Sequence, residues 1–221
     1  MESENGIKEY ETVMQQHLFN SKVNGAEPSI VGIGENLNLG CGFQKLRGFI
    51  NVDMFDNCDP DVIWDLNQFP WPWEDNSIDY IFASHILEHL DNWWGAMVEA
   101  SRILKSKGTL HIRVPDESES SAGTYRDHKH ILSVFSFYGL MDGTGSIFRW
   151  ERNVNAWAKE HYGEIPLKIV SYAQVPHTQY QWMVRWCPWL MRFCSDHMRN
   201  FIHEQRMEFE KVPDNIFKGK G

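Results

Sequence analysis

The sequence lacks any long apolar run. No stretch approaches the roughly eighteen consecutive apolar residues that a membrane-spanning helix requires. The opening residues, MESENGIKEY, are acidic and polar, whereas an export signal is basic and then apolar. We therefore expect no membrane partner and no export, and we place the protein in the cytoplasm. Its 42% hydrophobic residues and ten tryptophans are typical of a folded chain.

Cysteine is also scarce. The chain contains no C-x-x-C pair, and four cysteines are few for a disulfide-held protein of 221 residues. We expect reduced, mostly buried thiols. The residues are Cys41, Cys58, Cys187 and Cys194.

Positive charge is in deficit. Lysine and arginine number 21 against 30 aspartates and glutamates, which gives a formal net charge of −9. No basic stripe interrupts this balance. Because proteins hold duplex nucleic acid mainly through cations that face its phosphates, we expect no duplex nucleic acid partner.

What the chain does contain predicts a single domain over 1–221. Residues 1–33 predict an N-terminal helix and loop, and residues 117–221 a substrate-side and C-terminal part. Between them, short apolar runs closed by turn residues predict strands. Several lack polar alternation, which is typical of a parallel sheet covered on both faces. The strands are expected at 36–40, 49–53, 61–65, 78–84 and 108–116.

The run DNWWGAMVEASRILKSKG, between the last two predicted strands, predicts a helix. Asp91 is the expected N-cap, and Lys105, Lys107 and Gly108 are expected at its C-terminal end. The joint FQKLRG at 43–48 leaves only about six residues between two parallel strands, where a crossover normally needs a dozen. That joint is a departure from the usual α/β pattern.

Beyond residue 117 the pattern predicts helix and strand in turn. We expect a helical segment near 128–141, a strand pair near 167–174 and 179–186, and an amphipathic helix from about 188 to 211. The tryptophans of this part could line a pocket for a sugar or a ring, but we expect them in the core or at the interface of a homodimer. They are Trp150, Trp157, Trp182, Trp186 and Trp189.

The motif NLGCG, followed by NVD, is the strongest local signal. Gly40 and Gly42 lie on the turn after the first predicted strand, and Asp53 ends the second. Glycine lets the backbone approach a ligand closely, and an acid at that strand tip accepts both hydroxyls of a ribose. The pattern predicts a nucleoside site, without the G-x-G-x-x-G of dinucleotide sites, because position 45 is Lys45.

A second motif, SHILEHL, has two interpretations. Its His85, Glu88 and His89 have the H-x-x-E-H spacing of one class of zinc proteases. The motif nevertheless follows directly on the predicted strand IDYIFAS. A zinc hydrolase needs both histidines on one face of a continuous helix, and a strand that ends at Ser84 leaves little room for one. We therefore expect no metal and keep the zinc hydrolase as an alternative.

The series LNLGCG, GFINVD, VIWDLNQFPWPWEDNSIDYIFASHILEHL and SRILKSKGTLHIRVPD resembles, in order and spacing, the class I S-adenosylmethionine-dependent methyltransferases of the type 11 branch. The resemblance covers about residues 36–116. It implies a Rossmann-like α/β fold: a seven-stranded, mostly parallel sheet with helices on both faces and a reversed last strand. It also implies S-adenosyl-L-methionine as the cofactor.

The resemblance implies three groups of residues that contact the cofactor. The first group lies under its methionine and ribose part, the second flanks its adenine, and the third faces its methionine end and the incoming acceptor. The groups are Leu39, Gly40, Cys41 and Gly42 with Asp53 on the ribose hydroxyls; Asp65 and Leu66; and Ser84 with His85.

Methyl transfer asks little of protein side chains beyond alignment of the acceptor and exclusion of water. A base is needed only when the acceptor atom carries a proton. Candidates are His85, Asp116 and His128, the last beside His130. Each also has a structural interpretation, as a cap, a loop acid or a solvated histidine.

We therefore expect a methyltransferase that acts on an oxygen or nitrogen of a small metabolite or glycan. The residues ASHI stand where enzymes that methylate base amines carry [DN]-P-P-[YF], which disfavours adenine or cytosine acceptors. A non-catalytic, nucleoside-binding partner subunit is the alternative from another class of protein.

Overall fold

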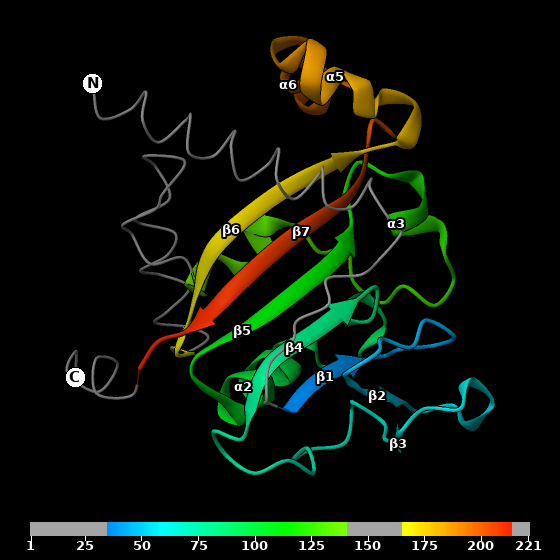
Figure 1. The fold of residues 1–221 in the computed structure, drawn as a ribbon. Helices are drawn as coiled ribbons and strands as arrows, with labels where there is room; N and C mark the ends of the chain where they lie inside the picture. The colour runs from blue at the N-terminus through cyan, green and yellow to red at the C-terminus, as the bar shows by residue number, and fades with distance from the viewer. Residues whose placement is uncertain (1–34, 141–164, 214–221) are drawn as a thin grey trace.

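The computed structural model describes residues 35–140 and 165–213, which contain one seven-stranded sheet (Figure 1). The strand order is β3-β2-β1-β4-β5-β7-β6. Strand β7 runs antiparallel to both its neighbours, and the other neighbouring pairs are parallel. The predicted mostly parallel sheet with a reversed last strand is confirmed. The strands are β1 (Glu35–Leu39), β2 (Ile50–Asp53), β3 (Val62–Ile63), β4 (Ile78–Ser84), β5 (Leu104–Pro115), β6 (Leu167–Pro176) and β7 (Ile202–Lys211).

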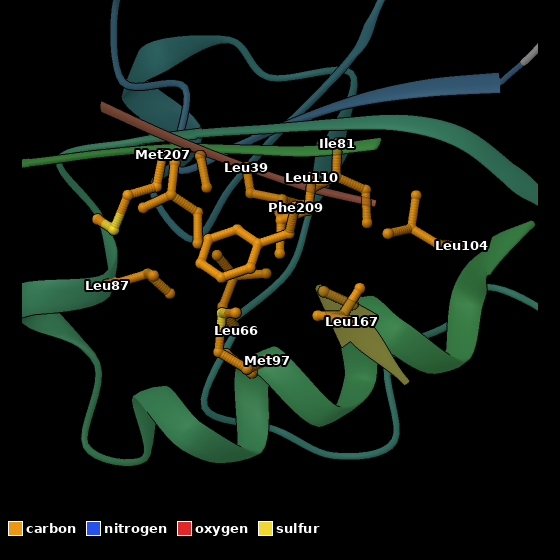
Figure 2. Close-up of a cluster of buried hydrophobic side chains, with 14 of the residues drawn as sticks. Leu39, Leu66, Ile81, Leu87, Met97, Leu104, Leu110, Leu167, Met207 and Phe209 are labelled. Atoms are coloured by element: carbon orange, nitrogen blue, oxygen red, sulfur yellow. The ribbon is translucent and has the colours of Figure 1, made fainter. Parts of the chain in front are cut away.

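Short helices connect these strands, and α2 lies against one face of the sheet (Figures 1 and 2). The helix and loop expected over residues 1–33 lie outside the described residues. No helix in the described ranges is both long and apolar enough to span a bilayer. The α-helices are α2 (Trp93–Ile103), α3 (Ser120–Thr124), α5 (Gln181–Trp186) and α6 (Pro188–His197); the 3-10 helices are η1 (Asp56–Cys58), η2 (Leu87–His89), η3 (Val134–Leu140) and η4 (Thr178–Tyr180).

Helix α2 forms where the sequence predicts a helix, but its ends differ from the prediction. Asn92, rather than Asp91, is the N-cap, because its side-chain oxygen accepts a hydrogen bond from Gly95 N at 2.8 Å. The helix ends at Ile103, and β5 begins at Leu104. The lysines and the glycine expected at its C-terminal end therefore belong to the strand.

The hydrophobic core lies between α2 and the sheet (Figure 2). From the helix, Met97 is 1% exposed. From the strands, Ile81, Leu110 and Phe209 are 0–2% exposed and belong to the same cluster. Burial of each such side chain contributes about 2 kcal/mol, so this layer holds the helix on the sheet.

The connection between β1 and β2, residues 40–49, contains no helix and is closed by buried asparagine side chains. Asn51 Oδ1 accepts from Leu46 N at 2.7 Å and from Asn38 Nδ2 at 2.9 Å. Its Nδ2 donates to Asp61 Oδ2 at 2.7 Å and to the carbonyls of Leu46 and Phe49. These bonds satisfy backbone groups that a crossover helix would otherwise satisfy, so two parallel strands pair across a short joint.

Two predictions in the second half of the chain are wrong. The helical segment predicted near 128–141 is wrong in its first part: within the described residues 128–140 the helix is η3, which begins at Val134, because the backbone N–H groups of Lys129 and His130 donate to Glu88 O on another loop. Residues 179–186 form η4 and α5 instead of a strand, although their aromatic residues favour strands. The strand predicted at 167–174 is confirmed as β6, whose partner is β7.

The helix expected from about 188 to 211 is wrong in its second half. Helix α6 ends at His197, and the chain then returns along the sheet as β7. Strand β7 consists largely of residues that favour helices, and its buried positions include Glu204, Gln205 and Lys211. Polar residues on a buried face hide the alternation that identifies a strand.

Helices α5 and α6 lie beyond the end of β6 and expose aromatic residues (Figure 1). Trp182 is 51% exposed, and Trp186 and Trp189 are each 73% exposed. The expected core placement is wrong for these three tryptophans, whereas Trp150 and Trp157 lie outside the described residues. A dimer interface at this surface stays a prediction.

Asn51→Ala should lower the free energy of unfolding by about 2 to 4 kcal/mol, because it leaves several buried backbone groups without partners. Asn57→Ala, at an exposed position in η1, is the control and should change it by no more than about 0.5 kcal/mol. Urea denaturation measures both. Equal stability of the two variants would contradict the role given to Asn51.

Candidate active site

The carboxyl ends of the parallel strands β1, β2, β4 and β5 lie at one edge of the sheet. Ligands of open α/β sheets bind at this edge. The predicted site residues lie at these strand ends or on the loops that leave them. The edge therefore gathers residues that are up to 89 positions apart in sequence, from Leu39 to His128.

The two glycines of the first turn differ in what surrounds them. Gly40 has φ +62°, and a Cβ there would lie 2.5 Å from Cγ1 of Ile86. Gly42 has φ +49°, and a Cβ there would meet nothing within 4 Å. Gly40 therefore lets the turn pack under the loop after β4, whereas Gly42 faces an open space that a ligand can fill.

Asp53, at the end of β2, is 8% exposed. Its Oδ2 accepts from Gly42 N at 2.8 Å, and its Oδ1 accepts from Phe55 N at 3.0 Å. Among the described residues no cationic side chain pairs with it. A carboxylate has about four lone-pair sites, so each oxygen can accept one more hydrogen bond, and the pair suits two adjacent hydroxyls.

Asp65 lies farther along this edge, and its Oδ1 accepts from the backbone N and the side-chain Nδ2 of Asn67 at 2.9 and 3.2 Å. Its other oxygen accepts no bond in the described chain. Leu66 points into the core, at 5% exposed (Figure 2). Only its backbone is therefore available to a ligand.

Leu39 and Cys41 are buried beside the glycine turn. Leu39 belongs to the core cluster. Burial, reinforced by the negative charge of Asp53, raises the pKa of the Cys41 thiol to about 11. Cys41 is therefore neutral at physiological pH and lies next to the site as an apolar residue.

His85 directly follows β4, after Ser84, and has φ +52°. Its Nε2 lies 2.9 Å from Glu204 Oε2, and its Nδ1 lies 3.3 Å from Glu88 Oε1. Burial lowers the pKa of His85, but the two carboxylates outweigh burial and raise it to about 9. His85 is thus a cation at neutral pH, with a carboxylate at each ring nitrogen.

Glu204 comes from the reversed strand β7. Burial raises its pKa, but His85 and the guanidinium of Arg206, whose Nε lies 2.5 Å from Oε1, lower it to about 2. The chain of charges Glu88, His85, Glu204 and Arg206 therefore ties the loop after β4 to β7. Sequence reasoning missed Glu204, because only the strand register brings it to His85.

Asp116 follows β5 and is 3% exposed. Its Oδ1 accepts from Ser118 N at 2.9 Å and Ser118 Oγ at 2.6 Å, and its Oδ2 accepts from Gln205 Nε2 at 2.8 Å. Oδ1 therefore accepts two hydrogen bonds, and Oδ2 accepts one in the described chain. No sequence motif points to Gln205, which holds the loop after β5 through this contact.

Comparison with known proteins agrees with this architecture. Residues 59–112 match the model of the methyltransferase domain, type 11. A SAM-dependent methyltransferase from Archaeoglobus fulgidus is 15% identical with a TM-score of 0.52, over 91% of this chain and 94% of that one. An S-adenosylmethionine-dependent methyltransferase from Mesorhizobium loti is 12% identical with a TM-score of 0.49, over 80% and 90%. No curated protein matches the chain.

Residues 59–112 therefore match the type 11 methyltransferase domain, and the described fold is that of the class I methyltransferases. The match to this domain implies S-adenosyl-L-methionine as the cofactor, which supplies a methyl group activated by a sulfonium. The residues of this methyltransferase fit that group. The open space at Gly42 is where a Cβ would intrude, and Asp53 keeps two acceptor sites for ribose hydroxyls.

His128, the third candidate base, follows α3. Its Nδ1 lies 3.1 Å from Ala122 O, and its ring packs on the ring of His89 with centroids 4.8 Å apart. The Nε2 of neighbouring His130 is buried and bonds no group in the described residues. The structure thus places His128 beside His89 and Glu88 rather than against His85.

The helix that the zinc-hydrolase alternative requires is absent from this part of the described chain. Strand β4 ends at Ser84, the backbone of His85 is in the left-handed conformation, and the single 3-10 turn η2 follows. His85 and His89 therefore do not share one face of a helix. The arrangement predicted from H-x-x-E-H does not form.

The two glycines give a matched pair of variants. Gly42→Ala adds a methyl into open space and should cost only about 1 kcal/mol of stability through its positive φ, while weakening cofactor binding at least about tenfold. Gly40→Ala adds a clash with Ile86 and should cost about 2 to 4 kcal/mol. Calorimetry with S-adenosylhomocysteine and urea denaturation measure the two effects. Tight binding by Gly42→Ala would contradict the pocket.

Glu204→Gln should lower the free energy of unfolding by about 2 to 3 kcal/mol at pH 6, because it leaves His85 with one carboxylate fewer. The folded pKa of Glu204, about 2, lies below its ordinary value of 4.5. The contribution is therefore present above pH 4.5 and is lost as pH falls through about 2. Denaturation measured from pH 6 down to pH 3 follows this loss.

Glu210→Gln is the control on the same strand. Its carboxylate pairs with Lys168 Nζ at 2.8 Å, and both side chains are about one third exposed. A pair in that setting contributes about 0 to 1 kcal/mol. If the two variants lose equal stability at pH 6, Glu204 has no special role.

Proposed function

We propose that this methyltransferase moves the methyl group of S-adenosylmethionine to an oxygen or nitrogen of a small metabolite or glycan. The observation that carries the proposal is the pairing of an open glycine turn with a carboxylate that no cation occupies, Gly42 beside Asp53. Asp65 and the backbone of Leu66 extend the same edge toward the adenine. Ser84 and His85 border its acceptor end.

The acceptor end is polar and charged, which supports a polar acceptor. His85 is 38% exposed at its side chain and is held between two buried carboxylates. Both of its ring nitrogens face carboxylates, and each oxygen of Asp116 already accepts at least one hydrogen bond. In this proposal His85 positions the acceptor, and Asp116 holds the loop after β5 beside it. The nucleophilic atom belongs to the acceptor, and any proton on that atom passes to a group other than these two residues.

Two sequence features narrow the acceptor class. The residues after β4 are ASHI, not the [DN]-P-P-[YF] typical of enzymes that methylate base amines. The net charge of −9 disfavours duplex nucleic acid. The proposal places the enzyme in the cytoplasm, and the exposed aromatic surface of α5 and α6 makes a homodimer part of it.

Asp53→Ala should weaken the binding of S-adenosylhomocysteine about a hundredfold or more, because two charge-assisted hydrogen bonds are lost. The rise in melting temperature on adding the ligand should disappear. Asp56→Ala, an exposed acid in η1, is the control and should keep the rise. An unchanged rise in Asp53→Ala would remove the main support for the site.

Turnover is tested separately from binding. Release of S-adenosylhomocysteine is measured with pools of small hydroxylated and aminated metabolites and of oligosaccharides, with duplex DNA as a negative pool. Release with one of the first pools supports the proposal. Cofactor binding with no release from any pool would favour the alternative, a non-catalytic partner subunit.

A further inference from the structure

Glu88, on the loop after β4, is a buried acid without hydrogen bonds to its carboxylate. Its side chain is 1% exposed, and no group in the described chain donates to either oxygen. The nearest cation, His85 Nδ1, lies 3.3 Å from Oε1 without hydrogen-bond geometry. The His85 cation faces only Oε1, so Oε2 of this buried carboxylate has no partner in the described chain, and a second cation would relieve that cost.

Two histidines offer ring nitrogens to this carboxylate. One ligand atom from each of Glu88, His89 and His128 lies within 4.8 Å of the other two. Both histidines have the δ nitrogen committed elsewhere: His89 Nδ1 lies 3.1 Å from Asp127 O, and His128 Nδ1 lies 3.1 Å from Ala122 O. A carbonyl can only accept, so each Nδ1 carries the hydrogen, and each Nε2 keeps a lone pair.

That pattern is the one that metal-binding histidines show. The nitrogen that does not bind the metal usually donates to a backbone carbonyl or a carboxylate, which fixes the tautomer and the direction of the ring. Asp127 adds a carboxylate oxygen 3.4 Å from His89 Nδ1. The outer contacts of a metal site are therefore already formed around His89 and His128.

We propose that Glu88, His89 and His128 bind a divalent first-row cation, Zn²⁺ being the ion that two imidazoles and a carboxylate suit. Ligand atoms about 2.1 Å from a tetrahedral ion lie about 3.4 Å apart. Small side-chain rotations bring the three residues to that spacing. A water completes the coordination, and the site replaces the expectation that the protein holds no metal.

A second cluster shows what distinguishes this site. Glu119, His177 and His203 also lie within 4.8 Å of one another, but Glu119 is already bonded to His177 Nε2. Its carboxylate and that ring nitrogen therefore satisfy each other. Glu88 faces His85, which is outside its cluster, and accepts no hydrogen bond from His89 or His128, so we assign the cation to the cluster of Glu88, His89 and His128.

The site joins two loops at the acceptor side of the edge. Glu88 and His89 belong to the loop after β4, and His128 to the segment after α3. The backbone already links them, since Lys129 N and His130 N donate to Glu88 O at 2.8 and 3.2 Å. The cation adds a side-chain clamp to this link. In the proposal His128 is thus a ligand rather than the general base.

The test is titration of untagged, chelator-treated full-length protein with Zn²⁺ and, separately, Mg²⁺, followed by calorimetry and melting temperature. We expect one equivalent of Zn²⁺ to bind and raise the melting temperature, and Mg²⁺, which prefers oxygen ligands, to do neither. The measurement needs no cofactor or acceptor, so its outcome is independent of the methyl-transfer proposal.

His128→Ala and His89→Ala should each weaken Zn²⁺ binding at least about a hundredfold. The matched control is His197→Ala, because His197 Nδ1 also lies near a carbonyl, Phe193 O at 2.9 Å, but no acid joins it. Glu88→Gln tests the carboxylate; if it fails to fold, the two histidine variants decide. Absence of stoichiometric Zn²⁺ binding, or equal affinity in His128→Ala and His197→Ala, overturns the proposal.

Discussion

The structure depends most on the buried side chain of Asn51. It satisfies the backbone of a connection too short to contain a helix, so that β1 and β2 can pair in parallel. Its bond with Asn38 joins the two strands directly. Gly42 lies in this joint and donates to Asp53, at the end of β2, at 2.8 Å. The geometry of the nucleoside end of the site therefore depends on the side-chain amide of Asn51.

The first half of the fold could be predicted from sequence because its signals are local. Strand β4 was predicted at its observed bounds, 78–84, from a continuous apolar run. The second half could not. Strand β7 buries Glu204, Gln205 and Lys211 between β5 and β6, and its composition favours a helix. Only pairing with strands remote in sequence overrides that preference.

The site residues also fall into two groups, those that the sequence predicts and those that it does not. The motifs around Gly40, Asp53 and His85 could be identified from spacing, and the structure places them at one edge. The groups that set the charge of His85 could not, because Glu204 lies 119 positions away along the chain. Short motifs indicate which residues lie near a cofactor. The charges around those residues, by contrast, depend on how strands remote in sequence pair with one another.

Strand β7 also carries Gln205, whose Oε1 accepts from Val134 N at 2.9 Å while its Nε2 holds Asp116. One strand thus anchors the loops after β4 and β5 and the segment that leads to η3. In ribosomal synthesis this strand emerges after every other element of the sheet. The contacts that hold His85 and Asp116 are therefore completed only after residues 202–211 have been synthesised.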